Sequence, residues 1–187
     1  MTVLLPSADV SNTGWTATGR SSLWECLQEG TGAPDDDLTY VLSATAGDVF
    51  VVQLASGTAP GGTAIHTVSV RARTSGGVGT AQPQVLVELL ETATVRGSTT
   101  IQTTRGFPFA WQTFAFTASG IGVYTDLRLR VTVSSLTGTQ RVRVSAAQLE
   151  YAPAVTYGPR GKLAQPGAEA GSVTSAGVER GTMTPCT

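Results

Sequence analysis

The strongest constraint on the fold of this chain is a strict alternation of apolar and polar residues in short segments. From Leu127 to Val133 every odd position is apolar and every even position is polar. Because successive side chains of a β-strand point to opposite faces of a sheet, this pattern predicts an antiparallel strand with one buried face. No long stretch of the sequence shows the 3.6-residue period of an amphipathic helix. The chain is therefore predicted to be all-β.

A second alternating segment contains a break that predicts a β-bulge. Its apolar residues occupy even positions from Val142 to Ala146 and odd positions from Ala147 to Tyr151. A slip of one residue without turn residues is typical of an extra residue in one strand. The linker 136–140 predicts a hairpin turn that joins this strand to the preceding one.

The remaining segments extend the pattern to a complete β-sandwich over residues 1–151. Residues 23–29 are compatible with one or two helical turns, although their Thr, Ser and Gly-rich flanks favour a strand or loop. About eight to ten strands with Gly-rich turns between them indicate a two-sheet antiparallel sandwich, and a jelly-roll-like arrangement fits best. The other expected strands are residues 3–5, 15–18, 39–43, 49–54, 68–73, 84–90, 95–103 (at a sheet edge) and 111–116.

The composition points to a surface that is weakly charged and rich in hydroxyl groups. Charged residues make up 13% of the chain, against a usual share of about 25%, and the formal net charge is −1. A dedicated nucleic-acid binder normally has a basic face, so we expect no nucleic-acid partner. The sequence shows neither the basic start of a secretion signal nor an apolar run of the roughly 20 residues that cross a membrane, so we expect no membrane partner.

The last 36 residues, 152–187, lose all periodicity and contain six Gly and four Pro. Such a segment cannot bury enough of its own surface to offset the entropy lost on ordering it. It is either a disordered tail or an extended arm that becomes ordered on a neighbouring molecule, and we predict the arm. Its isolated apolar residues Val173, Val178 and Met183 are expected to contact a partner, with residues 171–177 suited to strand addition.

Three blocks of sequence together carry a resemblance: residues 6–15 with 22–25 and 35–43, residues 66–73, and residues 124–130 with 141–145 and 149–150. In this order they resemble the small β-sandwich proteins encoded among the structural genes of tailed bacteriophages. Those proteins look like carbohydrate-binding-module jelly rolls and are thought to be virion components. The resemblance covers roughly residues 3–151, and it implies a virion part without selecting capsid decoration, neck, collar, tail or fibre.

The acidic run Asp35, Asp36 and Asp37 is the candidate metal site. Carboxylates in a loop are ligands that Ca²⁺ prefers, so a structural calcium is one interpretation. The alternative, which we favour, is a solvated acidic turn in which one aspartate caps the next element. Adjacent carboxylates cannot all face one ion, and the spacing matches no EF-hand loop. We therefore expect no cofactor.

The sequence contains no catalytic motif. His66, the only histidine, is in phase with the apolar Val68 and Val70, so a structural role at the strand end is expected. Cys26 and Cys186 are expected to be free thiols rather than a disulfide, with Cys26 in the core. A glycosidase would need a pair of carboxylates, but nothing selects one among Glu25, Glu29, Glu88, Glu91 and Glu150.

Aromatic residues offer a surface for either protein or sugar contact. Phe107, Phe109 and Trp111 lie in or beside a loop-like stretch and are the best candidates, with protein contact favoured. Trp15 and Trp24 fall within the blocks that carry the resemblance, which implies core anchors rather than a platform for glycans.

Arginines occupy the polar positions of three alternating segments. If the three strands are neighbours, the side chains form a ladder on one sheet surface, which either blocks edge aggregation or docks an acidic partner. The six residues are Arg71, Arg73, Arg128, Arg130, Arg141 and Arg143.

These observations lead to a non-enzymatic virion structural protein that docks on repeated subunits through its sandwich and arm. The expected partners are major capsid, neck or tail subunits and copies of itself, and the expected location is the virion, after synthesis in the host cytoplasm. The alternative is a carbohydrate-binding module that attaches to host or environmental glycans, and a glycan-cleaving enzyme is a third, weaker interpretation. The carbohydrate-binding module would use exposed aromatic side chains, and the enzyme would use a pair of acidic side chains.

Overall fold

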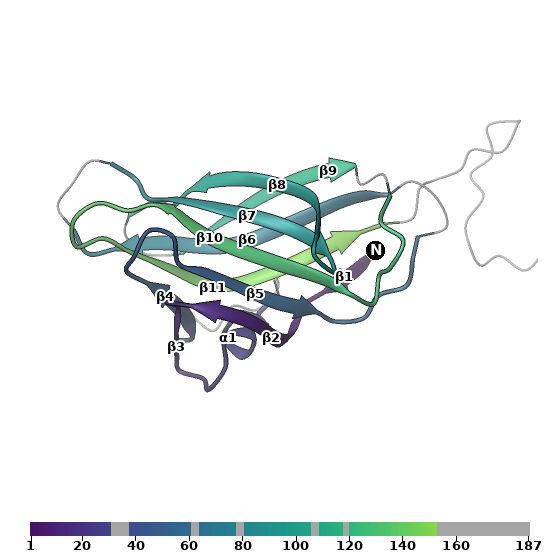
Figure 1. The fold of residues 1–187 in the computed structure, drawn as a ribbon, viewed down its shortest axis with the longest axis horizontal. Coiled ribbons are helices and arrows are strands. Elements are labelled where there is room, and N and C mark those ends of the chain that lie inside the picture. The colour runs from purple at the N-terminus through teal and green to yellow at the C-terminus, as the bar shows by residue number, and fades with distance from the viewer. Residues whose placement is uncertain (31–37, 61–63, 78–80, 106–108, 118–119, 153–187) are drawn as a thin grey trace, which may run out of the picture. The chain divides into compact units, whose positions relative to one another are not determined.

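Two antiparallel β-sheets pack face to face in the computed structural model, which describes residues 1–30, 38–60, 64–77, 81–105, 109–117 and 120–152 (Figure 1). Sheet A has the order β3-β4-β11-β6-β9, with β1 also paired to β11, and sheet B has the order β2-β5-β10-β7-β8. The strands of sheet A are β1 (Thr2–Leu4), β3 (Thr16–Thr18), β4 (Tyr40–Ser43), β6 (Ile65–Ser75), β9 (Ala110–Thr117) and β11 (Arg141–Tyr151). The strands of sheet B are β2 (Pro6–Thr13), β5 (Val49–Leu54), β7 (Gln84–Glu91), β8 (Thr94–Gln102) and β10 (Leu127–Ser135). The predicted jelly-roll-like β-sandwich is confirmed.

The alternating segments form strands as predicted. In β10 the odd residues from Leu127 to Val133 are buried, and the polar residues between them are half-buried on the outer face. The predicted bulge in β11 is confirmed, but the register shifts between Val144 and Ala146, slightly earlier than expected. Ser145 is the extra residue, and its side chain is fully buried.

The linker 136–140 does not form the predicted hairpin. It contains a turn closed by the bond from the Gln140 N–H to the Thr137 carbonyl, but it connects β10 in sheet B to β11 in sheet A. A short turn permits either pairing or a change of sheet, and the choice depends on which distant strands each segment meets.

The core lies between the inner faces of the two sheets. Phe50 is fully buried, and the ring of Trp15 packs edge-on against it with the ring centroids 4.9 Å apart. The interpretation of Trp15 as a core anchor is confirmed. The largest other fully buried side chains include Leu27, Leu54, Leu89, Leu127, Leu129 and Leu149.

Residues 23–27 form α1 (Leu23–Leu27), so a short helix replaces the strand or loop that the sequence favoured. The helix lies beside β2 and β3 at one edge of the sandwich (Figure 1). No helix in the described part of the chain is long and apolar enough to cross a membrane. The predicted arm lies outside the described residues from residue 153 onward and stays a prediction.

Candidate functional site

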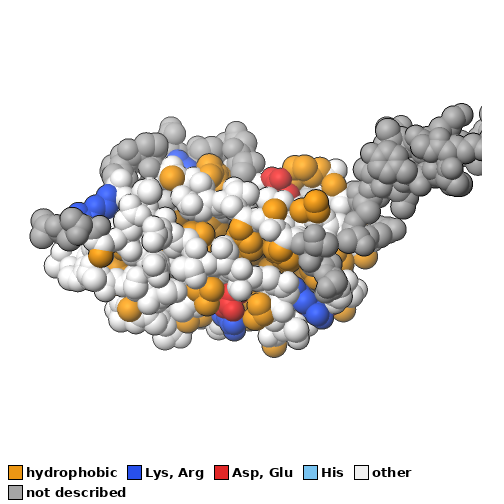
Figure 2. Space-filling model, turned by 90° about the horizontal axis from the view of Figure 1, so that it is seen from above, with side chains coloured by type: hydrophobic (Ala, Val, Ile, Leu, Met, Phe, Trp, Pro, Cys, Tyr) orange, Lys and Arg blue, Asp and Glu red, His pale blue; other side chains and the backbone are white. Residues whose placement is uncertain are grey.

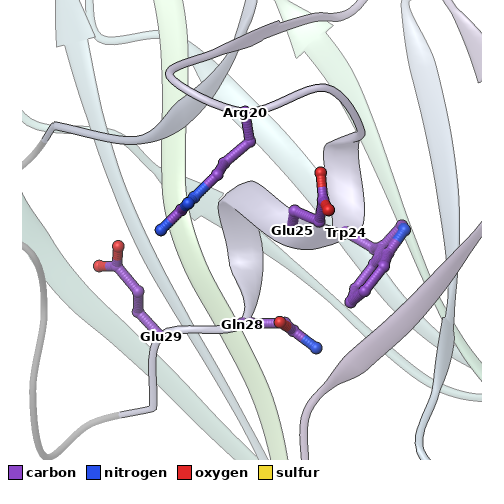
Figure 3. A pocket seen from close by; sticks show the side chains of 5 residues that line it. All are labelled: Arg20, Trp24, Glu25, Gln28 and Glu29. Atoms are coloured by element: carbon purple, nitrogen blue, oxygen red, sulfur yellow. The ribbon is translucent and has the colours of Figure 1, made fainter.

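A pocket of about 310 Å³ opens beside α1 (Figure 3). In Figure 3 the side chains of Trp24 and Gln28 lie on one side of the helix and those of Arg20 and Glu29 on the other. The pocket therefore combines an aromatic ring with groups that donate and accept hydrogen bonds. Its lining residues are Arg20, Trp24, Glu25, Gln28 and Glu29.

The two faces of α1 explain why Trp24 lines a pocket instead of filling the core. Leu23, Cys26 and Leu27 are buried and hold the helix on the sandwich. The 3.6-residue period then turns Trp24 away from them, so its indole is half-buried and packs only partly against the core. The interpretation of Trp24 as a core anchor is confirmed in part, since the ring packs against the core but also lines the pocket.

An aspartate from a distant strand fixes the start of the helix. Asp9 in β2 accepts hydrogen bonds from the backbone N–H groups of Leu23 (3.0 Å) and Trp24 (2.8 Å) through its two carboxylate oxygens. These are two of the N–H groups that have no partner within a helix. Because Asp9 holds the backbone of Trp24 directly, the position of the indole depends on β2.

The carboxylate of Glu25 is also held in place. Its Oε2 accepts bonds from the Ser21 hydroxyl (2.9 Å) and the Ser22 backbone N–H (3.2 Å). Hydrogen bonds from Ser22 and Ser21 lower the pKa of Glu25 below its ordinary value. Glu25 is therefore a charged acceptor of hydrogen bonds at neutral pH.

Two more lining side chains of the pocket are tied to neighbouring segments. Gln28 donates from Nε2 to the Pro6 carbonyl (3.2 Å), and Glu29 accepts a bond from the Thr39 hydroxyl (2.8 Å). These contacts already restrict the two side chains, so less conformational entropy is lost when a ligand binds.

The outer face of sheet A carries a second group of aromatic and basic side chains. The guanidinium carbons of Arg71 and Arg73 lie 5.3 Å and 4.4 Å from the ring centroid of Phe109, and that of Arg143 lies 4.6 Å from the ring of Tyr40. Such distances are typical of cation–π contacts. Phe109 is only 4% exposed, so the expectation of a surface aromatic at this position is wrong.

The six arginines do not form one ladder, because only two of the three strands are neighbours: β6 and β11 pair with Arg73 opposite Arg143, whereas β10 belongs to the other sheet. Arg71, Arg73, Arg141 and Arg143 lie on β6 and β11 in sheet A, whereas Arg128 and Arg130 lie on β10 in sheet B. In sheet B, Arg128 pairs with Asp126 and Arg130 with Glu88.

The other predicted contact residues are not brought together with the α1 pocket. Trp111 is half-buried on β9, opposite Arg71 in the register of sheet A. Phe107, Val173, Val178 and Met183 lie outside the described residues, as do Asp35, Asp36 and Asp37. Among the residues that the structure describes, no group of three or more His, Cys, Asp or Glu side chains is placed to hold a metal ion.

His66 and Cys26 are buried parts of the framework. His66 shares a 2.8 Å hydrogen bond between its Nε2 and the Tyr124 hydroxyl, and it stacks on Phe116 and Tyr151. Burial lowers the pKa of His66, which favours the neutral ring. Cys26 is a free, buried thiol whose pKa is raised by burial, while Cys186 lies outside the described residues.

Of the five glutamates considered for catalysis, Glu25 and Glu29 line the same pocket. Glu88 pairs with Arg130 and Glu150 accepts a bond from Gln148. Glu91 accepts bonds from the backbone N–H groups of Gly122 (2.8 Å) and Val123 (2.6 Å), and it pairs with Arg96.

We expect Glu91 to make stability depend on pH. Burial opposes its charge, but the hydrogen bonds from Val123, Gly122 and Arg96 outweigh that effect and lower the pKa of Glu91 below its ordinary value of 4.5. A lowered folded-state pKa stabilises the fold above the unfolded-state pKa, and the stabilisation is lost as the pH falls through the folded-state value. Glu91→Gln should cost about 1–3 kcal/mol at pH 7, as measured by urea unfolding from pH 7 to 3. The gap between variant and wild type should narrow below about pH 4.5, and a gap independent of pH would contradict this role.

No protein-family model matches the sequence, and a search of curated proteins finds no match. Among solved structures, the catalytic domain of Agl-KA is similar with a TM-score of 0.50 and 12% identity, over 89% of this chain and 29% of that chain. A CBM36 carbohydrate-binding module in complex with calcium and xylotriose has a TM-score of 0.43 and 16% identity, over 81% of this chain and 100% of that chain. The enzymatically active domain of tailspike protein 4 from bacteriophage CBA120 has a TM-score of 0.45 and 13% identity, over 80% of this chain and 19% of that chain.

Carbohydrate-binding modules named CBM4, CBM22 and CBM36 are thus among the structural neighbours of this chain. At identities of 9% to 16% over these modules and the phage domain, the likeness is one of fold. The virion assignment implied by the sequence resemblance stays a prediction. The β-sandwich fold of this chain rests on its own two antiparallel sheets.

Proposed function

We propose that the protein is a non-catalytic carbohydrate-binding module whose binding site is the α1 pocket. The observation that carries the proposal is the half-buried indole of Trp24 in one pocket with Arg20, Gln28 and two carboxylates. A pyranose ring has an apolar face of C–H groups and a rim of hydroxyls. An aromatic ring packs against the face, and charged or amide groups bond the hydroxyls.

The state of Glu25 does not suit the general acid of a glycosidase. A glycosidase general acid must hold a proton near neutral pH, which requires a raised pKa. Hydrogen bonds from Ser22 and Ser21 instead lower the pKa of Glu25. In this pocket the carboxylate accepts hydrogen bonds from sugar hydroxyls and transfers no proton.

The size and charge of the pocket limit the kinds of sugar that can bind. Its volume of about 310 Å³ is at the small end of ligand sites, so it holds a short segment of a glycan. Two carboxylates against one guanidinium give the pocket an excess of negative charge, which disfavours uronic acids and sulfated sugars. The expected ligands are neutral polysaccharides.

The test is retention on a panel of neutral and acidic polysaccharides by affinity electrophoresis, with wild type and two tryptophan variants. Trp24→Ala should lower the affinity for the retained polysaccharide at least about tenfold, equivalent to 1.4 kcal/mol. Trp111→Ala is the matched control, since Trp111 is also half-buried but lies on β9, outside the pocket. Melting curves establish that both variants fold. Unchanged binding by the Trp24 variant, or loss of binding only in the Trp111 variant, would contradict the proposal.

The virion structural role is the second candidate, and one observation favours it. The edge strand β9 carries no charged residue, which suits contact with other protein. A virion location, capsid, neck or tail partners and the absence of enzyme activity all remain proposals.

A further inference from the structure

We infer that the free edge of β9 pairs with β9 of a second copy of this chain, so that sheet A continues across a two-fold axis. Among the described strands, β9 pairs only with β6 and ends sheet A. Its eight residues, Ala-Trp-Gln-Thr-Phe-Ala-Phe-Thr, include no charge, no proline and no glycine. An exposed edge strand has unpaired N–H and C=O groups that can bond to another strand. Charged residues, proline or irregularities in the edge strand normally prevent this pairing.

The other described edges carry the protective features that β9 lacks. In sheet B, β2 begins with Pro6 and has two register irregularities. At the other end of that sheet, β8 contains Arg96 and Gly97, and its pairing with β7 shifts register. The strands β1 and β3 are only three residues long. Of the edges that the structure describes, β9 therefore offers the longest unprotected strand.

The side of the sandwich that β9 borders is apolar. Seen from above in Figure 2, on the side of β8 and β9, hydrophobic side chains gather along the middle and charged ones are sparse. Phe114 and Phe116 are half-buried, and they stack on each other with their centroids 5.8 Å apart. An additional strand beside β9 would cover both rings.

The chemistry of β9 selects a second copy as the occupant. A charged peptide partner would be recognised by complementary charge, which β9 does not offer. Two identical uncharged strands meet without repulsion, and the net charge of −1 adds little long-range repulsion between copies. Antiparallel pairing about a two-fold axis is self-complementary, as closed dimers require.

One register satisfies the alternation of side chains. With Phe114 opposite Phe114 of the second copy, Thr113 lies opposite Ala115, and Gln112 lies opposite Phe116. Residues directly opposite then share a face, and aromatic side chains meet on the apolar face. The contact is small, so we expect a dissociation constant of about 1–100 µM, typical of weak interfaces.

Sedimentation velocity of the full chain over a concentration series, without saccharide, tests the inference. Wild type should shift from monomer to dimer. Thr113→Lys/Ala115→Lys places like charges opposite each other at both pairs and should weaken dimerisation at least about tenfold. Both positions are exposed in the monomer, and circular dichroism verifies the fold.

The matched control is Ser98→Lys/Thr100→Lys on the exposed positions of β8, which should dimerise like wild type. A wild type that stays monomeric would overturn the inference, and so would a β9 variant that dimerises like wild type. Loss of dimer only in the β8 variant would overturn it too. Because no saccharide is present, these outcomes are independent of the proposed glycan site.

Discussion

Gly14→Ala is expected to destabilise the protein by about 2–5 kcal/mol, the sum of backbone strain and overpacking. Gly14 has a φ of +83°, which L-residues with a side chain rarely adopt, and an added Cβ would overlap the carboxylate of Asp48. Asp48 is buried and hydrogen-bonded to the Ser43 hydroxyl at 2.6 Å. Its carboxylate therefore cannot move aside without losing that bond.

The matched control for this prediction is Gly47→Ala. Gly47 has a similar φ of +93°, but nothing lies within 4 Å of an added Cβ. Its substitution should cost only the backbone term, about 1–2 kcal/mol. Urea unfolding of both variants measures the difference, which isolates the contact with Asp48. Equal losses of stability in the two variants would show that contact with Asp48 does not restrict position 14 to glycine.

Phe50→Ala is expected to cost about 3–5 kcal/mol, as large-to-small changes of buried aromatics do. Phe50 is fully buried in β5, and its ring supports the edge of Trp15. Since whole domains are stable by only about 5–15 kcal/mol, this change removes a large share of the total. Denaturant unfolding of the wild type and the variant measures this loss of stability.

Val51→Ala on the same strand is the control for Phe50→Ala. Val51 is half-buried on the outer face of sheet B, so its truncation should cost about 1 kcal/mol or less. A comparable loss from both variants would contradict the assignment of inner and outer faces in β5.

The strands with clear alternation could be predicted from the sequence, because their pattern depends only on burial of one face. The strand β2 was not predicted. It contains Pro6 and Asp9, has two register irregularities, and is exposed along most of its length. An edge strand of this kind buries too little to leave an alternating pattern. The sequence also does not predict which strands form each sheet, because β10 and β11 are neighbours in the chain but pair with distant strands.

The candidate site could be predicted less well than the fold. The resemblance implies a core position for Trp24, and the helical phase of Leu23, Cys26 and Leu27 is not evident from so short a segment. The partner that fixes the helix, Asp9, lies on another strand, and local sequence does not reveal such a contact. Had the helix been assigned, its phase would have placed Trp24 on the outer side.

Glycan binding in the α1 pocket is tested most directly by a two-dimensional ¹H–¹⁵N NMR titration of the wild-type protein with the neutral oligosaccharide that the panel selects. The indole N–H of Trp24 and the backbone amides of residues 20–29 are expected to shift most. Shifts centred on Tyr40, Trp111 and Arg143, with the amides of α1 unchanged, would place the glycan on the outer face of sheet A and contradict the α1 pocket as the binding site.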